Sequence, residues 1–175
     1  LINNVLDLAK IEAGHMELAL ADYSVQDTAL SVTSALRSLA AQKGLDLVTA
    51  VSDDLPLAYG DGGRIAQCLM NLAGNALKLT EQGRIEIAVD LRGDLLCFRV
   101  ADTGTGIAED RLEAVFREFR QGDPTIAGQF GGTGLGLSVA RQLARLLGGD
   151  VSVHSAMGSG STFTVDLPLA APHPE

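Results

Sequence analysis

The sequence predicts an α/β fold, a two-layer sandwich in which helices pack on a mixed β-sheet. Segments with helical periodicity and segments with strand alternation both occur, without the regular repeat of a parallel doubly wound sheet. Hydrophobic residues are 46% and charged residues 20% of the 175 residues, which is ordinary for a globular protein. No apolar run reaches the roughly 18–20 residues of a membrane span. We therefore expect one globular domain that contains both kinds of element.

The first two helices are predicted from the spacing of apolar residues. An opening helix, which Gly14 is suited to end, has an apolar face made of Ile2, Val5, Leu6 and Ala9. Residues 16–20 alternate in polarity and predict a short strand or an extended link. Ser24 is a suitable N-cap for a second helix, which Gly44 ends. The apolar stripe of that helix comprises Val25, Ala29, Val32, Leu36 and Leu39.

The rest of the chain mixes strands and helices. Strands are predicted at residues 45–51, 85–90, 95–101, 151–154 and 161–167. Helices are predicted over residues 63–79 and 137–147, and a turn at 92–94 joins two of the strands. The glycine-rich stretch from 102 to 136 is expected to hold only a short helix near 109–116.

Charge and cysteine usage exclude some classes of function. Lysine and arginine number 13 against 22 aspartate and glutamate, a net charge of −9. This balance argues against binding nucleic acid or an anionic membrane through general electrostatics. Cys68 and Cys97 lie in apolar surroundings and are expected to be reduced core residues. The chain starts at Leu1 inside a helical pattern, without a secretory signal, so we expect a fragment of a longer protein.

The helix over residues 63–79 has two distinct faces. Its core stripe comprises Ile65, Cys68, Leu69, Leu72 and Ala76. Gln67, Asn71, Asn75 and Lys78 are spaced 4, 4 and 3 residues apart, so they share another face. Amide oxygens suit a hard cation that keeps several waters, and the lysine would balance phosphate charge. This face therefore indicates a Mg²⁺–polyphosphate site, and a merely solvated polar face is the equally weighted alternative.

Glycine-rich segments supply three further candidate sites. Asp102 follows a buried strand, and the glycines after it let backbone approach a flat ligand whose amine the carboxylate accepts, as in adenine. Residues 131–137 open a helix and can form a nest of N–H groups for phosphate. Neither the Rossmann pattern nor the P-loop pattern is present. Residues 158–163 join two strands. An ordinary Asp-Gly turn and an ordinary hairpin turn are the alternatives for the first and last segments.

In this order, the motifs resemble those of the ATP-binding catalytic domain of sensor histidine kinases, within the GHKL ATPase superfamily. The five matching segments are residues 71–80 (N box), 102–107 (G1 box), 116–119 (F box), 132–136 (G2 box) and 158–163 (G3 turn). The resemblance implies the Bergerat fold, with a mixed, mainly antiparallel sheet, and it implies ATP and Mg²⁺ as cofactors.

The resemblance also implies roles for individual residues. Asn75 would coordinate Mg²⁺ with support from Asn71, Lys78 would face the phosphates, and Asp102 would accept from the adenine amine. The first three form the expected catalytic set. The other expected ATP-binding residues are Gly104, Gly106, Ile107, Gly132, Thr133, Gly134, Leu135, Gly136 and Thr162. Residues 122–131 are expected to form a lid.

The same resemblance implies three parts: residues 1–15 are the end of the second dimerisation helix, 16–169 the catalytic domain and 170–175 a tail. Histidine kinases accept phosphate on a histidine of the first dimerisation helix, which an acidic residue follows. His15, His154 and His173 all lack that context. The phosphoacceptor is therefore expected upstream, in the parent protein.

The resulting hypothesis is an enzyme module that transfers the γ-phosphoryl of Mg-ATP to a histidine of its own upstream dimerisation domain, for relay to a response regulator aspartate. The parent is expected to be a homodimer, and the domain to be cytoplasmic, without nucleic-acid or membrane contact. A GHKL ATPase clamp is one alternative, and it needs a transducer domain that supplies a lysine. A nucleotide-binding module without catalysis is the other.

Overall fold

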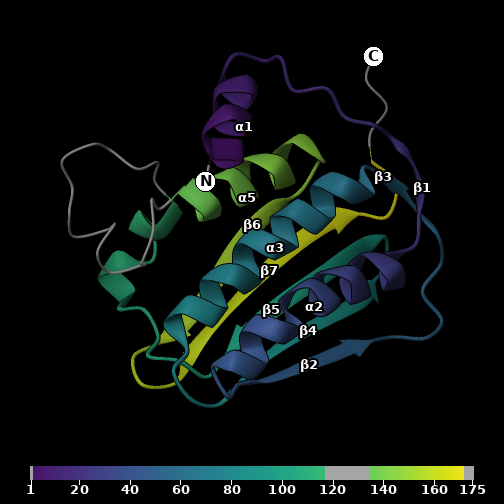
Figure 1. The fold of residues 1–175 in the computed structure, drawn as a ribbon. Helices are drawn as coiled ribbons and strands as arrows, with labels where there is room; N and C mark the ends of the chain where they lie inside the picture. The colour runs from purple at the N-terminus through teal and green to yellow at the C-terminus, as the bar shows by residue number, and fades with distance from the viewer. Residues whose placement is uncertain (1, 117–134, 172–175) are drawn as a thin grey trace.

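The computed structural model describes residues 2–116 and 135–171, with side chains from 5–116 and 136–171 (Figure 1). Its main sheet has the order β2-β4-β5-β7-β6. Its strands are β2 (Asp46–Val51), β4 (Arg84–Arg92), β5 (Leu95–Asp102), β6 (Asp150–Ala156) and β7 (Gly160–Pro168). Only the β2–β4 pair in this sheet is parallel. The predicted mixed, mainly antiparallel sheet is confirmed.

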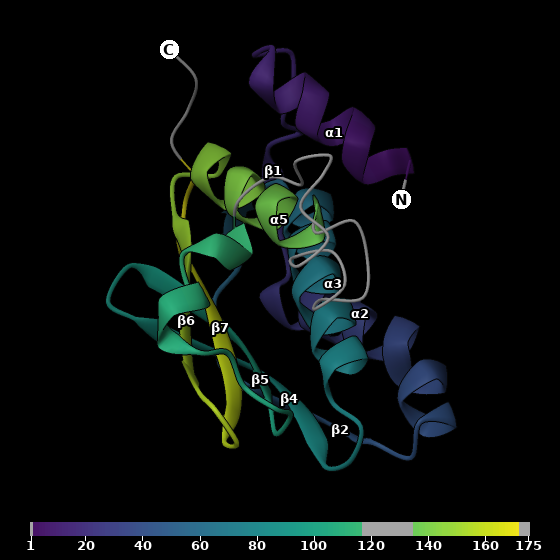
Figure 2. The ribbon, with the colours of Figure 1, turned by 90° about the vertical axis from the view of Figure 1, so that its left-hand side faces the viewer.

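The second layer is helical and covers one face of this sheet. It contains α2 (Val25–Gln42), α3 (Gly62–Leu79) and α5 (Leu135–Leu146), which lie together on one side in Figure 2. Buried side chains of both layers form one core, in which Phe98 and Phe163 are the largest. The two-layer α/β sandwich expected from the sequence is therefore what the chain forms.

The second helix begins where the sequence predicts and differs in one residue of its stripe. The Ser24 Oγ accepts from the Asp27 N–H at 3.2 Å, and Gly44 ends the helix with φ +68°. Leu39 is 52% exposed, whereas Ala40 is buried. The stripe continues from Leu36 by four residues and not by three, so Ala40 takes the place predicted for Leu39.

The opening helix α1 (Ile2–Glu12) buries a different face from the one predicted. Val5 and Leu6 are exposed, whereas Leu8 is buried against Val139 and Leu143 of α5. Polar contacts accompany this packing: the buried carboxylate of Asp7 lies 3.5 Å from the Arg64 guanidinium and accepts from Gln67, both on α3. Docking on the helical layer decides which side of α1 is buried, and the helix periodicity alone does not.

Several short elements also differ from the predictions. Of the two alternatives for residues 16–20, the link without a strand is the one observed, whereas the pairing of β1 (Ala21–Tyr23) with β3 (Ala58–Gly60) in a separate two-stranded sheet was not predicted. Two 3₁₀ turns, Glu109–Arg111 and Ala114–Phe116, replace the single short helix. Three-residue elements carry too little periodicity to be identified, and the β1–β3 pair joins segments far apart in the chain.

Two simpler expectations are confirmed within the described residues. Cys68 and Cys97 are free and buried, and burial raises the pKa of their thiols to about 12 and about 11. None of the described helices is both long and apolar enough to cross a membrane.

Candidate functional site

Helix α3 carries the first half of the candidate site. The Asp61 carboxylate caps its N-terminus by accepting from the Arg64 N–H at 3.1 Å, and its whole predicted core stripe is buried. On the polar face, Asn71 and Asn75 are half-buried and Lys78 is exposed. Gln67, which the spacing placed with them, donates instead to Asp7 of α1. The polar face therefore divides into a docking end and an open end.

The open end contains polar atoms that no described group satisfies. The Nδ2 atoms of Asn71 and Asn75 and the Oγ1 of Thr80 are buried without a hydrogen-bond partner. A buried polar group without a partner costs free energy, so native proteins rarely leave one unpaired. Asn71 and Asn75 lie in the second half of α3 and Thr80 directly follows it, and no group of the described residues pairs with these three atoms. Thr80 was not among the predicted site residues, although it is the last residue of the matched N box, residues 71–80.

Asp102 forms the second half of the site, at the end of β5. It is 7% exposed, and its Oδ1 accepts from the Gly104 N–H at 2.9 Å and from the Ser161 N–H at 3.3 Å. Burial raises the pKa of the carboxyl, and these two hydrogen bonds partly counteract that shift. An ordinary surface Asp-Gly turn does not bury its carboxylate in this way, so the geometry favours the ligand-reading interpretation.

Close backbone contact joins the two halves. A Cβ on Gly104 would lie 2.7 Å from the Leu79 carbonyl oxygen, 3.0 Å from Asp102 Oδ1 and 3.1 Å from Thr80 Oγ1. Only glycine fits this position without displacing the end of α3. The structure thereby brings Thr80 and Asp102 together, from segments that are 22 residues apart in the chain.

The loop after Asp102 is fastened to the β6–β7 hairpin. Gly106 has φ +77°, and a Cβ there would collide with the Ala156 carbonyl. The Ile107 N–H donates to Ser155 Oγ at 2.7 Å, and the Gly158 N–H donates to the Thr105 carbonyl at 2.8 Å. The predicted site residues Gly104, Gly106 and Ile107 thus lie in one rigidly held loop.

The start of α5 lies against the same face of α3. A Cβ on Gly136 would lie 3.8–3.9 Å from the Asn71 side chain, so the helix N-terminus approaches the middle of the polar face. N–H groups at the N-terminus of a helix attract anions. Leu135 opens the helix, whereas Gly132, Thr133 and Gly134 lie outside the described residues.

Thr162 is not brought to this site. The register pairs Asp102 with Ser161 and Ala101 with Thr162. Because side chains alternate along a strand, Ser161 shares the core face with Asp102 and Thr162 points to the opposite face. Ser161 is buried, and its Oγ lies 2.7 Å from Ser155 Oγ. The sequence prediction named Thr162 and missed the neighbouring Ser161. Strand alternation with Asp102 was the signal that could have identified Ser161.

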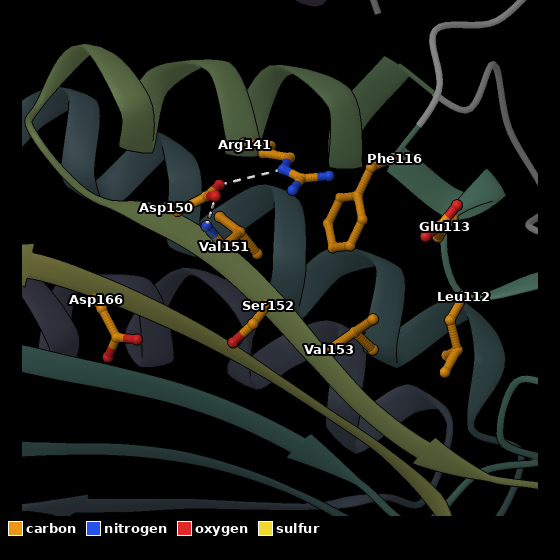
Figure 3. A pocket seen from close by; sticks show the side chains of 9 residues that line it. All are labelled: Leu112, Glu113, Phe116, Arg141, Asp150, Val151, Ser152, Val153 and Asp166. Atoms are coloured by element: carbon orange, nitrogen blue, oxygen red, sulfur yellow. Dashed lines mark hydrogen bonds and ion pairs between the residues drawn. The ribbon is translucent and has the colours of Figure 1, made fainter. Parts of the chain in front are cut away.

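A separate hollow of about 280 Å³ lies between the 3₁₀ turn Ala114–Phe116, α5 and the edge strand β6 (Figure 3). Phe116 borders it, packs edge-on against Phe163 at 5.9 Å between ring centroids, and carries the Arg141 guanidinium 4.9 Å above its ring. None of its nine lining residues belongs to the predicted nucleotide site. The aromatic of the F box that is described here therefore has a packing role. Phe119, the predicted lid over 122–131 and neighbouring Arg120 and Gln121 fall outside the described residues.

Two of the three histidines are described, and both are exposed. His15 follows the end of α1, and His154 lies on β6, on the face of the sheet away from the helices. His173 lies outside the described residues. His154 pairs with Thr162, one row from Asp102 in the sheet register, but its side chain lies on the opposite face of the sheet. No cluster of three or more His, Cys, Asp or Glu side chains suited to a metal is found in the part of the chain described.

Comparison with known proteins places this architecture in a family. Residues 60–171 match the model of the histidine kinase-, DNA gyrase B- and HSP90-like ATPases, and the chain belongs to that family. BarA, a signal transduction histidine-protein kinase of Escherichia coli K12, is 39% identical over 97% of this chain and 19% of BarA. Hybrid signal transduction histidine kinase B of Dictyostelium discoideum is 38% identical over 99% of the chain and 9% of that kinase.

The fold of the chain also agrees with that of a solved histidine kinase structure. Full-length ShkA in complex with AMPPNP superposes with a TM-score of 0.86 at 34% identity, over 99% of this chain and 36% of ShkA. The chain is thus the catalytic ATPase domain of a sensor histidine kinase, of the type used in two-component signalling. It spans only 9–19% of the length of the two curated relatives.

Proposed function

We propose that this domain binds Mg-ATP between α3, the loop after Asp102 and the start of α5, and presents the γ-phosphoryl to a histidine of its dimerisation domain. The observation that carries the proposal is the set of buried, unpartnered polar atoms on Asn71, Asn75 and Thr80. Thr80 Oγ1 and the buried Asp102 carboxylate both lie close to Gly104, and Asn71 lies beside Gly136 at the start of α5. This arrangement needs a ligand that is polar at both ends, as a nucleotide is.

In this proposal, one group of residues binds the adenine base and another binds Mg²⁺ and the phosphates. The Asp102 carboxylate accepts from the exocyclic amine of adenine, and Gly104, Gly106 and Ile107 form the wall beside the base. Asn75 holds Mg²⁺ with support from Asn71, since rotation of an amide presents its oxygen in place of its nitrogen. A bound Mg²⁺ would neutralise charge on the β- and γ-phosphates. Lys78, exposed in the last turn of α3, supplies a further positive charge.

Phosphate binding is assigned to the segment that opens α5: Gly132, Thr133, Gly134, Leu135 and Gly136. Transfer then requires positioning and charge neutralisation only. A bond forms between the acceptor imidazole nitrogen and the γ-phosphorus as the bond from phosphorus to the β–γ bridging oxygen breaks, and ADP leaves. The catalytic set within this chain is Asn71, Asn75 and Lys78.

The proposed partners follow from the same chemistry. The domain acts on its own dimerisation domain in a homodimeric parent, and a response regulator aspartate then takes the phosphoryl group. We infer that the domain is cytoplasmic, because the first of these steps consumes ATP and the cytoplasm supplies it. The alternative clamp-type ATPase is not favoured, because the relatives reported above are named as histidine kinases.

The test is calorimetric titration of ATP and GTP, with and without Mg²⁺, followed by transfer to a supplied dimerisation domain. We expect Mg²⁺-dependent ATP binding at least tenfold tighter than GTP binding, since guanine presents a carbonyl to the carboxylate. Label from γ-³²P-ATP should appear on the added domain and not on this chain. Equal affinities for the two nucleotides would remove Asp102 from the base-reading role.

A further inference from the structure

Ser155, near the end of β6, makes three polar contacts through one oxygen atom. Its Oγ accepts from the Ile107 N–H at 2.7 Å, lies 3.0 Å from the Gly160 carbonyl oxygen and lies 2.7 Å from Ser161 Oγ. Ser155 itself lies on β6, Ile107 lies in the loop after Asp102, and Gly160 and Ser161 are the first two residues of β7. One hydroxyl therefore connects three segments that meet at the base end of the site.

The hydrogen-bonding capacity of a hydroxyl fixes how these contacts are shared. A serine has one proton to donate and two lone pairs. A carbonyl oxygen can only accept, so the Ser155 proton goes to Gly160. Both lone pairs are then filled, one by the Ile107 N–H and one by the hydroxyl of Ser161. In this assignment every hydrogen-bonding position of Ser155 is occupied.

This network has a consequence for the neighbouring groups. In this assignment the Ser161 hydroxyl donates to Ser155 Oγ, and the Ser161 N–H donates to Asp102 Oδ1 at 3.3 Å. Ile107 is 4% exposed, so its N–H has no access to bulk water as a replacement partner. Ser155 thus links the loop that carries Ile107 to Ser161, whose N–H donates to Asp102 Oδ1, and no described hydrogen bond joins Ser155 to Asp102 itself.

We propose that Ser155 is a positioning residue for adenine recognition: it locks the loop that carries Gly106 and Ile107 onto β7 and thereby aligns the Asp102 carboxylate. The inference rests on the proposed function, because it concerns the same nucleotide site. If Ser155 only stabilised the fold, its substitution would lower the free energy of unfolding and leave the ratio of ATP affinity to GTP affinity unchanged. A positioning role lowers ATP affinity more than GTP affinity, because adenine presents its exocyclic amine to the carboxylate where guanine presents a carbonyl.

The experiment uses the full 175-residue chain in four forms: wild type, Ser155→Ala, Ser155→Thr and Ser152→Ala. Ser152 lies on the same strand, is exposed and faces the other side of the sheet, so it is the matched control. Dissociation constants for Mg-ATP and Mg-GTP are measured by calorimetry. Thermal unfolding without nucleotide shows what fraction of each variant is folded.

We expect Ser155→Ala to weaken ATP binding by about two- to tenfold, the range that one lost net hydrogen bond produces. GTP affinity should change less, so the ATP-to-GTP preference falls. Ser155→Thr retains the hydroxyl and should restore ATP affinity to within about twofold of wild type. Ser152→Ala should match wild type for both nucleotides.

Three other outcomes would contradict either the role of Ser155 or the proposed function. A folded Ser155→Ala variant with wild-type affinity for ATP would overturn the inference and leave the proposed function intact. Wild-type protein that fails to bind ATP would overturn the proposed function itself. If Ser155→Ala does not fold, Ser155→Cys decides, because a thiol fills the same space and is a weak acceptor. Equal ATP affinity in the Cys and Thr variants would then refute the positioning role.

Discussion

The two ends of the candidate site differ in how completely their polar groups are satisfied. At the base end, Asp102 accepts two backbone N–H groups, and Ser155 fills all its hydrogen-bonding positions. At the phosphate end, the amide nitrogens of Asn71 and Asn75 are buried and have no partner among the residues that the structure describes. The first region is already organised, and the second is left for a ligand to complete.

The two ends therefore contribute differently to the stability of the free protein and to the free energy of ligand binding. A satisfied network stabilises the fold whether or not nucleotide is present. An unsatisfied polar group costs stability in the free protein and recovers that cost when a ligand arrives. Substitutions at the base end should therefore change both stability and binding. Substitutions at the phosphate end should change binding with little loss of stability.

The largest effect is expected from Gly106→Ala, at the base end. Strain at φ +77° and collision with the Ala156 carbonyl should lower the free energy of unfolding by about 2–4 kcal/mol. Urea denaturation measures this loss. The control is Gly93→Ala, where φ is +62° and no heavy atom lies within 4 Å of the added Cβ. Its cost should be only about 1–2 kcal/mol. Equal costs would show that the contact with the hairpin is not tight.

Asp102→Asn comes next and separates recognition from folding. The amide keeps the shape and an acceptor oxygen, but it loses the charge that reads the adenine amine. ATP affinity should fall by about 1.5–3 kcal/mol, roughly 10- to 100-fold, with GTP affinity little changed. Calorimetry with both nucleotides measures the difference. A parallel loss for ATP and GTP would mean that the substitution damages the pocket as a whole.

Asn75→Ala tests the phosphate end. Alanine removes a buried unpartnered amide and has the better helix propensity, so apo stability should be unchanged or higher by up to about 1 kcal/mol. Mg²⁺-dependent ATP affinity should nevertheless fall by about tenfold, or roughly 1.4 kcal/mol. Thermal unfolding and titration with and without Mg²⁺ measure the two effects.

Gln67→Ala is the matched control on the same helix. It breaks the contact with Asp7 and should lower stability by about 1 kcal/mol while leaving ATP affinity at the wild-type value. If Asn75→Ala behaves like Gln67→Ala, the polar face of α3 is only a solvated surface.

The smallest effect concerns the pH dependence of stability. Burial raises the pKa of Asp102, so the folded protein takes up its proton at a higher pH than the unfolded chain does. As pH falls through that raised pKa, the wild type should gain stability relative to Asp102→Asn. The gain is complete below the ordinary range for aspartate. Denaturation midpoints at several pH values test this, and a relative loss of wild-type stability on acidification would contradict the sign.

Motifs whose residues are close in sequence were predictable from the sequence. Asn71 and Asn75 lie one helical turn apart, so their shared face follows from the helix period alone. The core stripe of α3 and the N-cap at Ser24 were identified for the same local reason. Asp102 was identified because it directly follows a largely apolar segment that predicts a buried strand. The order of motifs along the chain then indicated the family, which the comparisons confirm.

Contacts between distant segments were decided by the tertiary structure. Pairing of β5 with β7 places Ser161 and not Thr162 beside Asp102, and a shift of one residue in a strand reverses every side chain. Docking of α1 on α3 withdraws Gln67 from the polar face and leaves Val5 exposed. The long helices, the strands of the main sheet and the chemistry that each one carries were therefore predictable from sequence. Only packing between elements decided which side chains share the site, because those choices depend on register and on partners far away in the chain.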